Sequence, residues 1–217
     1  MLNGPCRGAR AALVVALTIL GSAAVAAQLA TRPAEEWAKV LDSPERLAGL
    51  RVPEVVAALK LAPTDVVADV GAGTGPFVPA MAGAVPKGKL YAVEVDAKFL
   101  PYIQRKADAA GAKNVQTILG AFTDPRLPAP DVDVAFMHDV FHHVEDRAGY
   151  VKALAKYLKP SGRIVVIDYK PENSPHRDEP KLQVSADQAK AFLSAAGFTR
   201  VEEIALFPDK WFVIARR

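Results

Sequence analysis

The segment "VVADVGAGTGPF", residues 66–77, constrains the fold more than any other part of the sequence. A short apolar run leads into three glycines within five positions, Gly71, Gly73 and Gly75. Glycines between a strand and a helix let the backbone approach a ligand closely, and the start of the helix offers free N–H groups. We therefore predict a strand–loop–helix unit whose backbone holds a ligand.

Short apolar runs alternate with helical segments after this loop. The predicted strands are residues 65–70, 89–95, 114–119, 132–138, 162–169, 199–207 and 210–217. Alternation of strands and helices implies parallel strands joined by right-handed crossovers. The last two strands are separated only by about Pro208 and Asp209, and so short a loop permits only an antiparallel pair. The sequence predicts an α/β fold, mostly parallel, with a C-terminal antiparallel hairpin.

Residues 1–27 have the composition of a secretory signal. Arg7 and Arg10 precede the uncharged run 11–27, which ends in small residues. A basic start, an apolar middle and a small-residue end are typical of a cleaved signal, and the alternative is a retained membrane anchor. Cys6 is the only cysteine and precedes the run, so a cleaved chain has none. We expect a periplasmic or secreted protein that meets a membrane only if this segment stays uncleaved.

Two further regions follow the predicted signal. Residues 28–62 are predicted to be a helical segment, with Ser43 as an N-cap, and residues 63–217 carry the strand–helix alternation. The polar, proline-rich stretch 170–181 follows the fifth predicted strand, where a lid or substrate loop can sit. A formal net charge of +3 is too small to indicate a nucleic-acid partner. The oligomeric state cannot be predicted from this sequence.

The glycine spacing distinguishes between two classes of ligand. Dinucleotide-binding loops follow the pattern G-x-G-x-x-G, which would place the third glycine at Pro76. The observed spacing departs from that pattern, so a nicotinamide-dependent oxidoreductase is the weaker alternative.

The same segment resembles motif I of the class I S-adenosylmethionine-dependent methyltransferases. "LYAVEVD", residues 90–96, is similar to the second-strand motif of that family, and "HHV" with "LKPSG", residues 142–144 and 158–162, is similar to its fourth- and fifth-strand segments. The resemblance runs from about residue 65 to 198, and extends to exported, uncharacterised bacterial members. It implies a Rossmann-like, doubly wound sheet of seven strands, S-adenosylmethionine as the cofactor, and methyl transfer to a small molecule or an envelope component.

The resemblance also implies which residues form the site. Glu94 would hold the ribose hydroxyls, since a carboxylate accepts two hydrogen bonds at once, and Asp124 would contact the adenine amino group. The complete set of cofactor-binding residues expected from the family is Asp69, Gly71, Ala72, Gly73, Gly75, Glu94, Asp124 and His138. His142 and His143 are expected to be catalytic.

Three of the four histidines lie in "HDVFHH", residues 138–143. With Asp139 they could form a metal site, because imidazole and carboxylate are good ligands. The resemblance instead favours a site without metal in which His142 or His143 is a general base, while His143 could equally be structural. A second alternative is an exported methyltransferase-like binding protein without turnover, because the cofactor is charged and made in the cytosol.

Overall fold

The computed structural model describes residues 33–217, and the predicted signal segment lies outside this range. Within the described range, none of the helices combines the length and apolar character that crossing a membrane requires. Residues 34–217 form one compact unit. The described part of the predicted helical segment therefore belongs to the same unit as the sheet.

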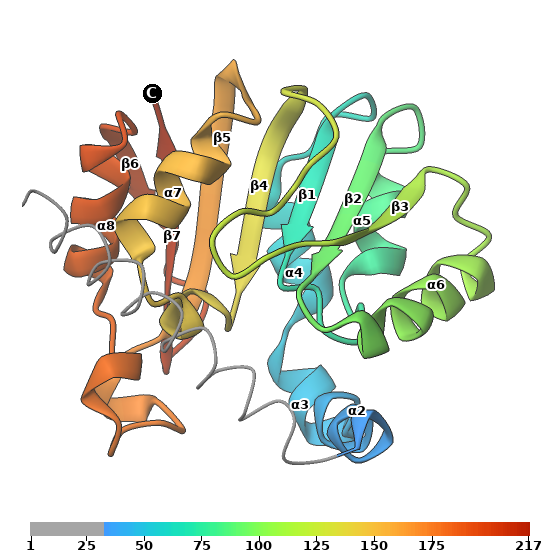
Figure 1. The fold of residues 1–217 in the computed structure, drawn as a ribbon, viewed down its shortest axis with the longest axis horizontal. Helices are drawn as coiled ribbons and strands as arrows, with labels where there is room; N and C mark the ends of the chain where they lie inside the picture. The colour runs from blue at the N-terminus through green and yellow to red at the C-terminus, as the bar shows by residue number, and fades with distance from the viewer. Residues whose placement is uncertain (1–32) are drawn as a thin grey trace, which may run out of the picture. The chain divides into compact units, whose positions relative to one another are not determined.

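A seven-stranded sheet forms the centre of this unit, as predicted (Figure 1). Its strands are β1 (Val66–Val70), β2 (Lys89–Glu94), β3 (Val115–Leu119), β4 (Val132–His138), β5 (Leu158–Tyr169), β6 (Arg200–Glu203) and β7 (Lys210–Arg216). They are ordered β3-β2-β1-β4-β5-β7-β6, and β7 alone runs antiparallel to its neighbours. From β1 the sheet extends through β2 and β3 on one side and through β4 and β5 on the other, so the strand order reverses between β1 and β4. A ligand crevice is expected at the carboxyl ends of the strands at such a switch point.

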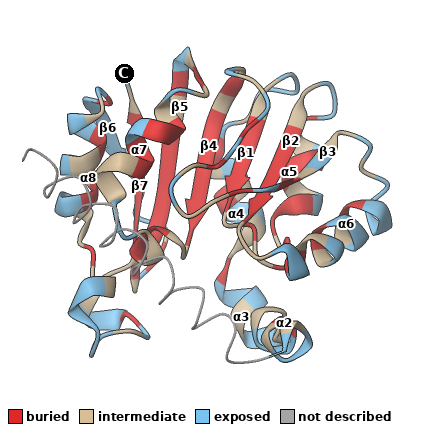
Figure 2. Cartoon of the chain, viewed as in Figure 1, coloured by how far each residue is buried: buried red, intermediate tan, exposed pale blue. Residues whose placement is uncertain are grey.

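Helices cover both faces of the sheet. They are α2 (Ala34–Leu41), α3 (Pro44–Gly49), α4 (Val52–Leu59), α5 (Val78–Ala84), α6 (Leu100–Ala109), α7 (Arg147–Ala155) and α8 (Ala186–Ala195). The buried residues of α4, α5 and α6 share one apolar cluster with the sheet, and those of α7 and α8 share the other. The central strands are accordingly buried along most of their length (Figure 2), as expected for parallel strands covered on both faces.

Local sequence signals explain where several helices begin. Ser43 accepts a hydrogen bond from the Arg46 amide, which confirms it as the N-cap of α3. Ser185 and Gln188 form a reciprocal capping box at the start of α8. These contacts satisfy backbone amides that have no partner within the helix.

Two strand boundaries differ from the prediction by more than one residue. β5 begins at Leu158 rather than Gly162, because the expected turn "LKPSG" is extended and Leu158 pairs with Val132 of β4. The register between the two strands then shifts between Val132 and Val134. β6 ends at Glu203, so six residues, 204–209, connect it to β7 rather than two. The antiparallel pairing is confirmed, but the length of the connection was wrong.

Candidate active site

The three glycines of the loop after β1 all have positive φ, but only at Gly73 would an added Cβ make no contact shorter than 3.9 Å. A Cβ on Gly71 would lie 2.3 Å from Val140, and one on Gly75 would lie 3.2 Å from the Ile103 Cα atom. A Cβ on Gly73 would meet only a Leu41 methyl at 3.9 Å. Gly71 and Gly75 are thus required by packing inside the protein, whereas the space beside Gly73 would allow a ligand to approach its backbone.

Glu94 lies directly beside this loop at the end of β2. Its carboxylate accepts hydrogen bonds from the amides of Gly73 at 2.8 Å, Val95 at 2.7 Å and Asp96 at 3.1 Å. Burial raises the pKa of Glu94, and the three amides oppose that rise. A carboxylate has about four lone-pair sites, two on each oxygen. The Val95 and Asp96 amides occupy both sites of Oε1. A ribose diol would therefore have to share Oε2 with the Gly73 amide.

Asp69 is buried one residue before the end of β1. Burial, followed by the nearby charge of Glu94, raises its pKa to about 7. Its Oδ2 atom is buried without a hydrogen-bond partner within the described residues. A buried oxygen without a partner, on a carboxylate close enough to Glu94 to interact with its charge, is what a polar or cationic ligand would satisfy, and these residues therefore fit S-adenosylmethionine.

The helical segment before the sheet is tied to the same loop. Asp42, between α2 and α3, accepts hydrogen bonds from Thr74 at 2.6 Å and from the Lys106 ammonium at 2.7 Å. Leu41 stands opposite Gly73. The chain segment around 41–42 therefore borders the open face of the glycine loop, which the sequence did not indicate.

His138 ends β4 among aromatic side chains. Its Nδ1 lies 3.3 Å from Asp139, and Asp139 also forms a 2.7 Å ion pair with the buried Lys210 ammonium. Although burial raises the pKa of Asp139, the charges of His138 and Lys210 outweigh it and lower the pKa overall. The Nε2 atom of His138 is buried without a partner in the described part of the chain. Lys210 starts β7, and sequence reasoning missed it because nothing local marks a lysine as buried.

His142 lies in the 3-10 turn η2 (Phe141–His143) and is held by Asp168 of β5. The His142 Nδ1 atom and the Asp168 Oδ1 atom are 2.7 Å apart, and the His142 amide donates to Oδ2 at 2.9 Å. The Tyr169 amide also donates to Asp168, at 2.8 Å. Asp168 is fully buried. This carboxylate fixes the imidazole orientation and leaves Nε2 available, yet no sequence motif singled it out.

His143 and His176 complete a cluster around His142. The ring centroids of His142 and His143 are 4.1 Å apart, and each lies within 5.4 Å of the His176 ring. Burial and then the neighbouring His142 lower the pKa of His143 to about 3. The fold thus separates His138 from the other two histidines of "HDVFHH" and replaces it with His176, from the loop after β5.

Asp124 has partners of its own. Its Oδ1 atom accepts from the Tyr157 hydroxyl at 2.8 Å and from the Arg126 amide at 2.7 Å. The bridge between Ala121 and Asp124 shapes the turn. Only the second carboxylate oxygen is without a described contact, so an adenine contact through Asp124 stays a prediction.

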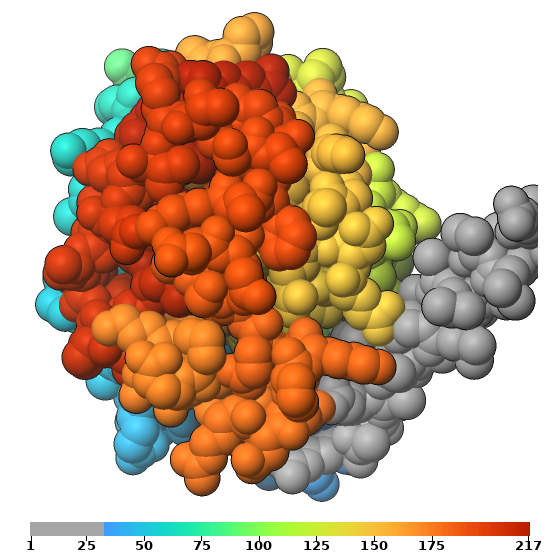
Figure 3. Space-filling view, turned by 90° about the vertical axis from the view of Figure 1, so that its left-hand side faces the viewer, coloured from blue at the N-terminus to red at the C-terminus, as the bar shows by residue number. Residues whose placement is uncertain are grey.

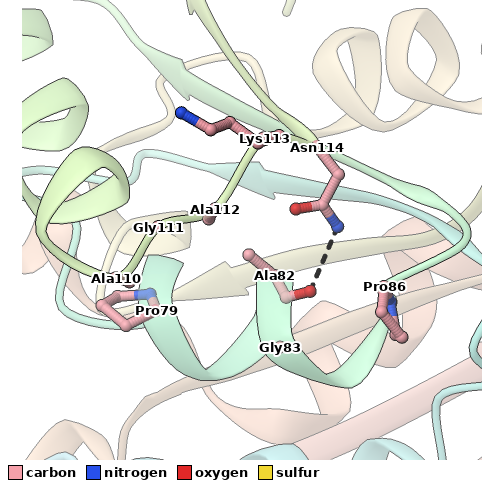
Figure 4. A pocket seen from close by; sticks show the side chains of 9 residues that line it. All are labelled: Pro79, Ala82, Gly83, Pro86, Ala110, Gly111, Ala112, Lys113 and Asn114. Carbon is pink, nitrogen blue, oxygen red and sulfur yellow. Dashed lines mark hydrogen bonds between the residues drawn. The ribbon is translucent and has the colours of Figure 1, made fainter.

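A surface hollow of about 450 Å³ lies elsewhere, between the C-terminal ends of α5 and α6 (Figure 4). Pro86, Gly111 and Asn114 are among its lining residues, and Asn114 bridges it by donating to the Ala82 carbonyl at 3.1 Å. These residues precede β2 and β3, at the sheet edge opposite the glycine loop. The hollow contains one ionisable side chain, Lys113, and we do not assign it to the reaction.

Comparisons with known proteins agree with this architecture. A family model described as a methyltransferase domain matches residues 68–166. A SAM-dependent methyltransferase from Aquifex aeolicus is 28% identical, with a TM-score of 0.75, over 85% of this chain and 98% of that one. No curated protein sequence matches the chain.

More distant structures share the fold. A putative O-methyltransferase from Nostoc punctiforme is 19% identical with a TM-score of 0.68, over 83% of this chain and 60% of that one. Magnesium protoporphyrin IX methyltransferase from Synechocystis, solved with bound SAH, is 19% identical with a TM-score of 0.60, over 79% of this chain and 84% of that one. The matched methyltransferase domain, the strand order and the glycine–glutamate pair together support an S-adenosylmethionine-dependent methyltransferase.

Proposed function

We propose that this methyltransferase transfers a methyl group from S-adenosylmethionine to a hydroxyl of a small molecule or of an envelope component. The observation that supports a hydroxyl acceptor is the 2.7 Å contact between His142 and Asp168. A hydroxyl is a weak nucleophile until its proton is removed, and an oriented imidazole is the usual base for that step.

We propose that the cofactor binds at the carboxyl ends of β1 and β2. Gly73 leaves room for the cofactor, and Glu94 would accept the ribose hydroxyls. Asp69 would offer its free oxygen to the cationic end. Gly71, Ala72 and Gly75 shape the loop, while His138 and Asp124 are proposed to complete the site. The cofactor supplies a methyl group on a sulfonium that is already a good leaving group, so positioning provides much of the rate.

The β4–β5 half is proposed to act on the acceptor. In the neutral imidazole, Asp168 accepts the Nδ1 proton of His142, so Nε2 is the atom that receives the acceptor's proton. Asp168 then stabilises the imidazolium. His143, which is held neutral near pH 7 by its lowered pKa, would hydrogen-bond to the acceptor rather than carry charge.

Substituting Asp168 tests this assignment. The full chain is incubated with methyl-labelled S-adenosylmethionine and either hydroxyl-bearing small molecules or an envelope extract, and label in the product is measured. Asp168→Asn should lower the rate by about 100-fold or more, because general bases contribute 10²–10⁴, while cofactor affinity is retained. The control is Asp131→Asn, at the opposite edge beside Tyr91. Equal rates for the two variants would contradict a base role for His142.

Export is a separate proposal. The basic start and apolar run of residues 1–27 support secretion to the periplasm or beyond, and an uncleaved segment would instead anchor the enzyme. Fractionation of cells that produce the full chain distinguishes the two. N-terminal sequencing should find the chain starting at Gln28 if the signal is cleaved, and an intact Met1 in the membrane fraction would support the anchor.

A further inference from the structure

The strongest unassigned feature is the histidine triad, which we define as His142, His143 and His176. Each contributes one ring nitrogen, and these atoms lie within 4.8 Å of one another. His142 is buried and the other two are half-buried, so the group is close enough to the surface for an ion to enter. Three imidazoles gathered in this way form a common ligand set for a transition metal.

Carboxylates hold two of the three rings in the orientation that metal sites use. Asp168 binds Nδ1 of His142 at 2.7 Å, and Glu179 lies 3.1 Å from Nδ1 of His176. A carboxylate on one ring nitrogen fixes the tautomer and leaves the other nitrogen's lone pair for the metal. Asp168 is itself held by the backbone amides of His142 and Tyr169, so the outer contacts are arranged before any ion arrives.

Backbone contacts hold the loop of His176 against the turn of His142. The Arg147 guanidinium donates to the His142 carbonyl at 2.7 Å and to the Lys181 carbonyl at 3.0 Å. Within the loop, the His176 amide donates to Ser174, and Gln183 donates to the His176 carbonyl. Figure 3 shows this orange segment at the surface beside the gold residues of α7. The positive charge of Arg147 is thus directed at carbonyl oxygens, and Asp168 and Glu179 supply negative charge to the triad.

We infer that the triad binds one divalent transition-metal ion, with Zn²⁺ as the best match. Zinc bonds to histidine nitrogen at about 2.0–2.1 Å, which places the nitrogens of a tetrahedral site about 3.4 Å apart. The nitrogens now lie within 4.8 Å of one another, so rotation of the two half-buried rings would have to bring them to this spacing when an ion binds. Three protein ligands leave a fourth position open for water or substrate, which is the arrangement of a catalytic rather than a structural zinc site.

This inference departs from the expectation of a metal-free site, and its acceptor chemistry rests on the proposed function. A metal on Nε2 of His142 uses the lone pair that a base needs. With an ion bound, the metal rather than His142 would activate the acceptor hydroxyl, and Asp168 would keep its role of orienting the His142 ring. Metal binding itself requires neither cofactor nor acceptor, so it can be tested independently of methyl transfer.

The test is calorimetric titration of Zn²⁺ into the metal-free full chain, produced without a histidine tag. We expect one ion per chain with micromolar or tighter affinity. His176→Ala should weaken binding by about 100-fold or more, and Glu179→Gln by about 10-fold, at the lower end of the effect of losing an outer-shell carboxylate. Glu172→Gln, an exposed acid in the same loop, should bind like the wild type.

Three results would overturn the inference. The first is a folded wild-type chain that takes up no stoichiometric zinc. The second is unchanged affinity in both His176→Ala and His143→Ala. The third is binding that depends on Cys6 and is lost in Cys6→Ser. S-adenosylhomocysteine binding, measured in parallel, should be the same in wild type and His176→Ala, so loss of the cofactor site would be recognised separately from loss of the metal site.

Discussion

The two halves of the sheet's carboxyl edge are held together by different kinds of contact. In the β1–β2 half, backbone amides of Gly73, Val95 and Asp96 surround the Glu94 carboxylate. In the β4–β5 half, the carboxylates also pair with charged or titratable side chains, Asp139 with Lys210 and Asp168 with His142, although Asp168 accepts from two backbone amides as well. Glycine spacing and one acid define the first half, whereas the second depends on residues distant in sequence.

This difference determines how each half should respond to change. Backbone amides cannot be removed by substitution, so the β1–β2 half is sensitive to steric filling and to the charge of its acids. A buried pair of side chains fails when one partner is removed, because the other is left charged and unpaired.

Lys210→Met should destabilise the protein most. It leaves Asp139 buried without its ammonium partner, and breaking a buried pair costs about 3–5 kcal/mol in the free energy of unfolding. Lys190→Met is the matched control, since Lys190 pairs near the surface with Asp187 and Glu203 and its loss should cost less than about 1 kcal/mol. Denaturant unfolding measures both. If Lys210→Met fails to fold, Asp139→Asn/Lys210→Met should recover part of the stability, and similar losses for both lysines would contradict a buried pair.

Gly73→Arg should abolish most cofactor binding while preserving the fold. The arginine fills the open face of the loop, and we expect at least about a 100-fold loss of affinity, or about 2.7 kcal/mol. Gly111→Arg is a close control, because Gly111 also has positive φ and a Cβ there meets nothing within 4 Å. Both variants have a similar backbone strain of about 1–2 kcal/mol. Equal loss of S-adenosylhomocysteine binding in both would argue against Gly73 as the contact.

Asp69→Asn should flatten the dependence of stability on pH. The folded pKa of Asp69, about 7, lies above its ordinary value of 3.8, so the unfolded chain ionises first. The contribution of Asp69 to the free energy of unfolding is therefore greatest below pH 3.8. It falls as the pH rises from 3.8 towards 7. Between pH 5 and pH 7 the wild type should lose about 2 kcal/mol from Asp69, at about 1.4 kcal/mol per pH unit. A slope unchanged in Asp69→Asn, measured by urea unfolding, would contradict the raised pKa.

Asp42→Asn should have the smallest effect. Its partly exposed contacts with Thr74 and Lys106 should contribute less than about 1 kcal/mol to unfolding. Because these contacts border the glycine loop, cofactor affinity should fall a few-fold, and calorimetry would detect this. Asp187→Asn removes an exposed ion pair with Lys190 on α8. This substitution should leave the affinity for the cofactor unchanged. A loss comparable to that of Gly73→Arg would show that the helical segment is part of the binding surface itself.

The same contrast explains what the sequence could predict. The β1–β2 half is local, so Gly73 and Glu94 were identified from adjacent motifs, and periodicity located all seven strands. Asp168, Lys210 and His176 required the three-dimensional fold, because burial of a lysine and convergence of a loop histidine leave no local pattern. The six-residue connection before β7 was missed because residues 204–207 are apolar and resemble a continuing strand.

The proposed function depends on binding of S-adenosylmethionine at the carboxyl edge between β1 and β2. This binding should be measured by calorimetric titration of the full chain with S-adenosylmethionine and S-adenosylhomocysteine. We predict one site per chain of micromolar affinity for both, retained in Gly111→Arg and lost in Gly73→Arg. A folded chain that binds neither compound, or that binds NADH in their place, would contradict the account.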